Sequence, residues 1–193
     1  ATSYDIIDPA NAARYKDAVQ KVLVPSLVKL ERVLITTALR EAETVQVGRT
    51  HGQHAVPITF GFALAGYISR LGGSIEALKS LAAELPGKFS GAVGAYNASS
   101  LFFDDPEGFE AEVLAELGLT PAEHSTQIVP PEVLTRLFCE VTIAAGVLAA
   151  LIQILKRVPF IGPALSTAGG ARTANVGLCA ALAHQHAAQL EDE

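Results

Sequence analysis

The stretch Val141 to Leu155, VTIAAGVLAALIQIL, carries no charged residue, although Glu140 precedes it and Lys156 follows it. A bilayer-spanning helix needs about 20 apolar residues, so this run is too short and burial in a helical bundle is the better interpretation. Apolar residues occupy every face, and several helices must cover them, some from other subunits if the chain supplies too few. The leucine spacing predicts a helix from about Pro131 with a coiled-coil-like seam. The seam positions are Leu134, Leu137, Val141, Ala144, Leu148, Leu151 and Leu155.

The rest of the chain shows the same helical periodicity, with apolar residues recurring at steps of three and four. Further helices are predicted over about residues 9–43, 58–84, 106–117 and 173–190. Pro25 should bend the first of these helices. No strand pattern of useful length appears. The sequence therefore predicts an all-α fold, with residues 1–193 forming a single helical-bundle domain.

Composition narrows the class of protein. Hydrophobic residues make up 50% of the 193 residues and charged residues 18%, which predicts a compact domain with a proper core. The net charge of -6 includes no basic block, so nucleic acid is not an expected partner. Cys139 and Cys179 lie in apolar helical sequence without metal-ligand spacing, which predicts buried free thiols and a reducing cytoplasm. The chain has no methionine, so we expect a fragment of a longer protein.

Polar chemistry is concentrated in residues 48–61, GRTHGQHAVPITFG. Thr50, His51 and Gln53 place a hydroxyl, an imidazole and an amide within four residues, and the glycines beside them let the backbone approach a ligand closely. Pro57 is suited to the first turn of the helix that is expected to follow. The stretch is therefore a candidate site, although a plain turn with a surface histidine would have the same sequence.

Three other segments belong with this one. Taken alone, residues 2–6 could be a helix cap, residues 87–98 a flexible loop and residues 125–128 a helix lead-in. Together, the four segments resemble in order and spacing the fumarase/aspartase superfamily, and most of all its adenylosuccinate lyase branch, over roughly the first 155 residues. The resemblance implies a long-helix bundle of the fumarase/aspartase type. The segments are Thr2-Ser3-Tyr4-Asp5-Ile6, Thr50-His51-Gly52-Gln53, residues 87–98 (GKFSGAVGAYNA) and Ser125-Thr126-Gln127-Ile128.

The resemblance also implies an activity. Members of the branch are carbon–nitrogen lyases of purine biosynthesis that eliminate fumarate from a succinyl-purine nucleotide (adenylosuccinate or SAICAR). A base removes a proton next to a carboxylate, a carbanion forms, and an acid protonates the departing nitrogen. The resemblance implies no cofactor, and it implies a homotetramer whose sites combine residues of several subunits. No metal is expected, because the cysteines lack metal-ligand spacing, and no membrane partner, because the uncharged run is too short.

Site residues carry over position by position. His51 matches the general acid, because an imidazole can give a proton near neutral pH and a hydroxyl or amide cannot. Thr50 and Gln127 match substrate-binding positions, and Thr2 with Ser3 match contacts to the dicarboxylate part. Lys88 is a further candidate substrate contact, for a carboxylate or phosphate; a solvated loop lysine is the alternative.

The sequence departs from the superfamily after the uncharged helix. The pattern there is a loop of the Gly-Ser-Ser-x-Met-Pro-x-Lys-x-Asn-Pro kind that bears the serine base, whereas residues 158–170 read VPFIGPALSTAGG. Ser166 lacks that context, so the expected base has no clear counterpart. Two hypotheses follow: a fumarate-eliminating lyase, of which this chain alone is inactive, or a helical assembly module without catalysis. Within the superfamily, a carboxymuconate cycloisomerase is the alternative enzyme.

Overall fold

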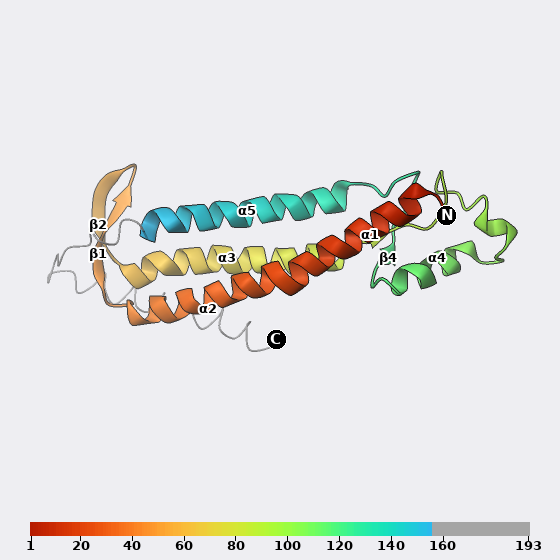
Figure 1. Cartoon of the computed structure of the whole chain (residues 1–193). Coiled ribbons are helices and arrows are strands. Elements are labelled where there is room, and N and C mark those ends of the chain that lie inside the picture. Colours follow the sequence, from red (N-terminus) through yellow and green to blue (C-terminus); the bar gives the residue numbers. More distant parts are fainter. Residues whose placement is uncertain (156–193) are drawn as a thin grey trace. The chain divides into compact units, whose positions relative to one another are not determined.

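The computed structural model describes residues 1–155, and these are mainly helical, which confirms the all-α fold class (Figure 1). They divide into two compact units. The first unit comprises Ala1–Pro25 and Glu76–Val141, and the second comprises Ser26–Ile75 and the residues from Thr142. Three sequence predictions lie outside the described residues: the helix over residues 173–190, Ser166 and Cys179.

The first predicted helix is present, and it begins earlier than predicted, because Thr2 and Asp5 cap its start. The Thr2 N–H donates to the Asp5 carboxylate at 2.7 Å and so satisfies one of the orphan donors of the first turn. A π-helical turn lies directly before Pro25, where the missing N–H and the bulky ring disturb the hydrogen-bond ladder. The helical segments are α1 (Ser3–Ala18), η1 (Val19–Leu23) and α2 (Val24–Arg40).

A β-hairpin joins α2 to α3 in the second unit, so the prediction that the chain has no strand was wrong (Figure 1). Strands β1 (Val45–Thr50) and β2 (Gln53–Thr59) pair antiparallel, and Pro57 lies in β2 opposite Val47 instead of opening a helix. The register shifts next to Gly48, where a Cβ atom would come within 2.5 Å of the Val56 carbonyl oxygen. Glycine is therefore required at that bulge.

Helix α3 (Phe60–Ala83) matches the predicted helix over residues 58–84. Thr59 begins it by accepting a hydrogen bond from the Phe62 N–H at 3.2 Å. Gly61, the second residue of α3, lies so close to α2 that an added Cβ atom would be 2.3 Å from the Ala38 carbonyl oxygen. The buried face of this unit includes Leu34, Ile35, Ala38, Leu64, Ile68 and Leu71.

In the first unit, short elements follow α3. Strands β3 (Pro86–Gly87) and β4 (Thr120–Pro121) pair parallel, with the 3-10 turn η2 (Ser99–Leu101) and helix α4 (Pro106–Ala115) between them. Helix α4 confirms the predicted short helix. Asp105 caps its start by accepting from the Gly108 N–H at 2.9 Å.

Helix α5 (Glu132–Leu155) confirms the predicted long helix. Leu137, Ala144 and Leu151 recur every seven residues along it and are buried, as expected of a seam. Other apolar side chains on it are exposed, including Phe138, Ile143 and Ile152. Cys139 is exposed as well, so the prediction that it is buried was wrong: it belongs to the outward face, two positions beyond Leu137.

Among residues 1–155, α5 is the one helix that is long and apolar enough to cross a membrane by length and composition. Within the chain, 22% of its most apolar window is buried. The length argument against a membrane span was wrong, because the helix extends beyond the uncharged run to 24 residues. Apolar side chains of α5 are exposed in the single chain, and their coverage by other helices stays a prediction.

Candidate functional site

Asp5 joins the beginning of α1 to the loop that follows β3. Its side chain is fully buried, and its carboxylate accepts hydrogen bonds from the Lys88 ammonium, from the Thr2 N–H at 2.7 Å and from the Gly91 N–H at 3.1 Å. Lys88 also donates to the Gly91 carbonyl oxygen at 2.9 Å. The segments that carry Thr2 and Lys88 are therefore held together in the first unit, and the solvated alternative for Lys88 was wrong because its side chain is 0% exposed.

The protonation of Asp5 reflects these contacts. Burial alone would raise the pKa of its carboxyl, because a charge loses hydration in the interior. The hydrogen bond from Lys88, those from the Thr2 and Gly91 N–H groups, and the lysine charge outweigh burial and hold the pKa below its ordinary value. Asp5 is thus an anion in the folded chain, and Lys88 is its counter-ion.

The loop after Lys88 has an unusual backbone. Gly91, Gly94 and Tyr96 have φ values of 86°, 74° and 54°, and for tyrosine this left-handed region is uncommon. Glu110 of α4 holds both ends of the loop, because its carboxylate accepts from the Phe89 N–H and from the Tyr96 hydroxyl, the latter at 2.5 Å. The loop is therefore attached at both ends, unlike the flexible loop that was the alternative interpretation of residues 87–98.

The same loop contacts the segment that contains Gln127. The hydroxyls of Ser90 and Ser125 are hydrogen-bonded at 2.8 Å. Gly94 lies against the backbone of Ser125 so closely that a Cβ atom would be 2.2 Å from the carbonyl oxygen. Glycine is required at this position by both the contact and the positive φ.

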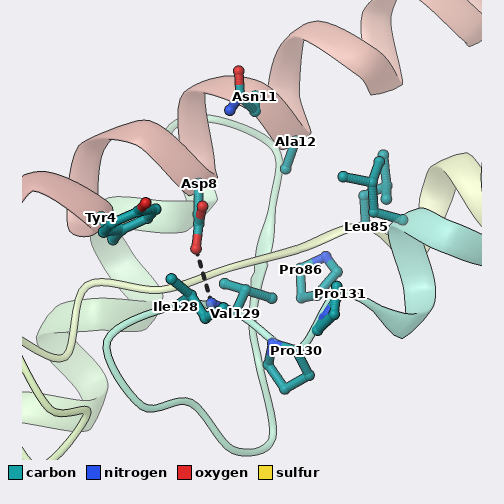
Figure 2. Close-up of a pocket in the computed structure, with 11 residues that line it drawn as sticks. Tyr4, Asp8, Asn11, Ala12, Leu85, Pro86, Ile128, Val129, Pro130 and Pro131 are labelled. Carbon is teal, nitrogen blue, oxygen red and sulfur yellow. Dashed lines mark hydrogen bonds between the residues drawn. The ribbon is translucent and has the colours of Figure 1, made fainter.

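Gln127 lies between two attached residues. On one side Ser125 bonds to Ser90, and on the other the Val129 N–H donates to the Asp8 carboxylate of α1 at 2.8 Å (Figure 2). Gln127 itself is exposed. The short segment therefore presents an exposed amide from a backbone that is held at both ends.

A cavity of about 230 Å³ lies beside this attachment, between α1 and residues 128–131 (Figure 2). Its lining is mostly apolar, with Asp8, Tyr4 and Asn11 as polar members. None of the residues that the sequence singled out as site residues lines it. The cavity thus neighbours the Gln127 segment without containing the predicted contacts.

Thr50 and His51 belong to the second unit. Thr50 pairs with Gln53 across the hairpin, and His51 and Gly52 form the turn with φ values of 52° and 74°. Two successive positive φ values are typical of a type I′ turn, in which Asn-Gly or Asp-Gly is the usual pair. His51 occupies a position that costs backbone strain, and its side chain is exposed at the tip of the hairpin.

The structure thus brings Thr2, Ser3, Lys88 and Gln127 into one unit, with Thr50 and His51 in the other. Sequence reasoning missed Glu110, which is only 3% exposed. A signal was present, since Glu110 and the buried Leu114 stand four residues apart on α4, on one helix face. A carboxylate on a buried face needs hydrogen-bond partners.

Comparisons with known proteins show the family of this chain. The profile of the family described as Lyase matches residues 1–154. Adenylosuccinate lyase of Pyrococcus abyssi is 38% identical over 149 residues, which are 77% of this chain and 32% of that protein. The chain belongs to the fumarase/aspartase superfamily. The family match ends where the sequence departs from the superfamily pattern.

Two further members of the superfamily are similar to this chain over a comparable share of their length. Adenylosuccinate lyase of Archaeoglobus fulgidus is 40% identical over 131 residues, covering 67% of this chain and 29% of that protein. The crystal structure of 3-carboxy-cis,cis-muconate lactonizing enzyme from Pseudomonas putida is similar with a TM-score of 0.67 and 32% identity, over 78% of this chain and 33% of that chain. The chain spans about a third of the length of these superfamily relatives.

Proposed function

We propose that this chain is the central segment of a carbon–nitrogen lyase that eliminates fumarate from a succinyl-purine nucleotide such as adenylosuccinate. The observation that carries the proposal is the 38% identity to an adenylosuccinate lyase over 149 residues. The attachments among the Thr2, Lys88 and Gln127 segments support it, because a small substrate can be held only by groups that lie close together.

In this proposal His51 is the general acid that protonates the departing nitrogen. Thr50 and Gln127 bind the substrate, and Thr2 and Ser3 bind its dicarboxylate part. Lys88 was predicted to contact the substrate, but its side chain is fully buried and paired with Asp5, so it holds the loop instead. His51 is exposed at the hairpin tip, so its imidazole is accessible to a substrate held by other groups. The site is completed when subunits assemble in a cytoplasmic tetramer, and the outward apolar face of α5 supports such an assembly.

A second candidate within the superfamily is cycloisomerisation of a carboxymuconate. It is favoured by the similarity to the solved lactonizing enzyme from Pseudomonas putida. The two candidates are distinguished by substrate: a fumarate-releasing lyase consumes adenylosuccinate, whereas a lactonizing enzyme consumes 3-carboxy-cis,cis-muconate and releases no fumarate.

The role of His51 as the acid can be tested by mutating the hairpin in the complete lyase, that is, the longer protein of which we propose this chain is the central segment. His51→Ala should lower kcat by about 10²–10⁴-fold, the usual size of a general-acid contribution. His54→Ala is the matched control, because His54 is an exposed histidine of the same hairpin, and kcat should stay within about twofold. Equal kcat values for the two variants would contradict the assignment of His51.

A further inference from the structure

The carboxylate of Glu110 occupies a position that the superfamily resemblance does not explain. It lies on α4, outside all four resembling segments, yet it is buried and contacts the loop of one of them, residues 87–98. A buried carboxylate loses hydration and persists where several donors compensate it. Here the donors are the Phe89 N–H and the Tyr96 hydroxyl, one from each end of the loop.

We propose that Glu110 is a positioning residue, whose carboxylate sets the conformation of the loop from Phe89 to Tyr96 and thereby the place of Gln127. Between its two contacts, the loop passes through two glycines and Tyr96 with positive φ values. A tyrosine in the left-handed region is strained, so other contacts must hold it there. The bond from the Tyr96 hydroxyl to Glu110 is such a contact, and the Tyr96 N–H also donates to the Ser90 carbonyl oxygen at 2.9 Å.

The loop that Glu110 holds also contacts the segment that carries Gln127, at two points. Ser90 bonds to Ser125, and Gly94 lies against the Ser125 backbone, two residues before Gln127. If the loop loses its conformation, both contacts are lost together. The consequence for substrate binding rests on the proposed function, whereas the consequence for the loop does not.

The environment of Tyr96 supplies a spectroscopic signature of this contact. Burial raises the pKa of the Tyr96 phenol, and the hydrogen bond to Glu110 and the charges of Glu110 and Glu107 raise it further above the ordinary value of about 10. The Tyr96 phenol should therefore ionise at a lower pH in Glu110→Gln than in the unchanged chain. Tyr96→Phe identifies its signal among the four tyrosines.

The first test is amide hydrogen exchange of the 193-residue chain. In Glu110→Ala, protection of amides in residues 89–97 and 125–127 should fall about 10- to 100-fold, since bonds to a charged group are lost, while amides of α3 keep theirs. Glu110→Gln should lose less, because its amide can accept from Phe89 and donate to Tyr96. Glu112→Gln, an exposed glutamate of the same helix, is the control and should change nothing.

Unchanged loop protection in Glu110→Ala, or an equal loss in every helix of the unit, would overturn the proposal. If Glu110→Ala does not fold, Glu110→Gln and Tyr96→Phe decide: normal loop protection in both would overturn it as well.

A second readout separates this inference from the proposed function. In the complete lyase, Glu110→Ala should raise KM about tenfold with a smaller change in kcat, and Glu110→Gln should raise KM less. If no fumarate is released by the unchanged enzyme while loop exchange responds as expected, the proposed function fails and the role of Glu110 stands. If the enzyme is active but loop exchange and KM do not respond, the role of Glu110 fails and the proposed function stands.

Discussion

Asp5 and Lys88, 83 residues apart in the chain, form a fully buried ion pair. The pair connects the cap of α1 to the loop that follows β3, and two of the segments shared with the superfamily meet there. A buried charge is costly without its partner, because its lost hydration is then uncompensated. Replacing either residue should therefore leave the other as an uncompensated buried charge and destabilise the fold.

Removing either partner of this pair should destabilise the chain severely. We expect Asp5→Asn and Lys88→Met each to lower the free energy of unfolding by roughly 3–5 kcal/mol, and the double replacement Asp5→Asn/Lys88→Met to cost less than the sum. Urea unfolding measures all three. Asp17→Asn, which breaks the exposed Lys21–Asp17 pair, is the control and should have little effect. Equal costs for the buried and exposed pairs would contradict this account.

The same carboxylate predicts an acid dependence. The pKa of Asp5 is lower in the folded chain than its ordinary value of 3.8, so the unfolded chain takes up the proton first as pH falls. The stability that Asp5 contributes is therefore present above that value and is lost as pH falls through the folded pKa. Urea unfolding between pH 5 and pH 2 should show the gap between the unchanged chain and Asp5→Asn narrowing. Parallel curves would show that Asp5 is not the titrating group.

Two glycines of α3 should respond in opposite directions to alanine. Gly61→Ala should be destabilising, because the new methyl group would lie 2.3 Å from the Ala38 carbonyl oxygen and force α2 and α3 apart. Gly66→Ala should stabilise by about 0.5–1 kcal/mol, since nothing lies within 4 Å of its Cβ position and alanine favours the helix. Thermal unfolding of both variants tests the pair, and a Gly61→Ala variant as stable as the unchanged chain would contradict the close contact assigned to Gly61.

Sequence periodicity predicted α3, α4 and α5 well because each buries one face that repeats every turn. The hairpin was missed because most of β2 is exposed on both faces, so no alternation marks it, and His51-Gly52 is not a usual turn pair. The Asp5–Lys88 and Tyr96–Glu110 contacts depend on how distant segments meet. The residue types were visible in the sequence, but their partners were not.

The outward face of α5 predicts assembly. Ile143 is 55% exposed in the single chain, and we expect it to be covered by helices of other subunits. Ile143→Asp should shift the mass measured by light scattering at micromolar concentration towards that of a monomer, because a carboxylate buried in an interface costs several kcal/mol. Gln20→Asp adds the same charge at an exposed polar position outside α5 and should leave the mass unchanged. A monomeric unchanged chain would contradict the assembly.

Fumarate release by a hybrid enzyme tests the central claim most directly. Residues 1–154 of this chain would replace the matching segment of the Pyrococcus abyssi adenylosuccinate lyase, whose remaining sequence supplies the parts that this chain lacks. With adenylosuccinate as substrate, ultraviolet absorbance should record fumarate release by the hybrid and a loss of about 10²–10⁴-fold in kcat on His51→Ala. A hybrid that assembles like its parent but releases no fumarate, or one indifferent to His51→Ala, would contradict the claim that this chain is the central segment of a fumarate-eliminating lyase.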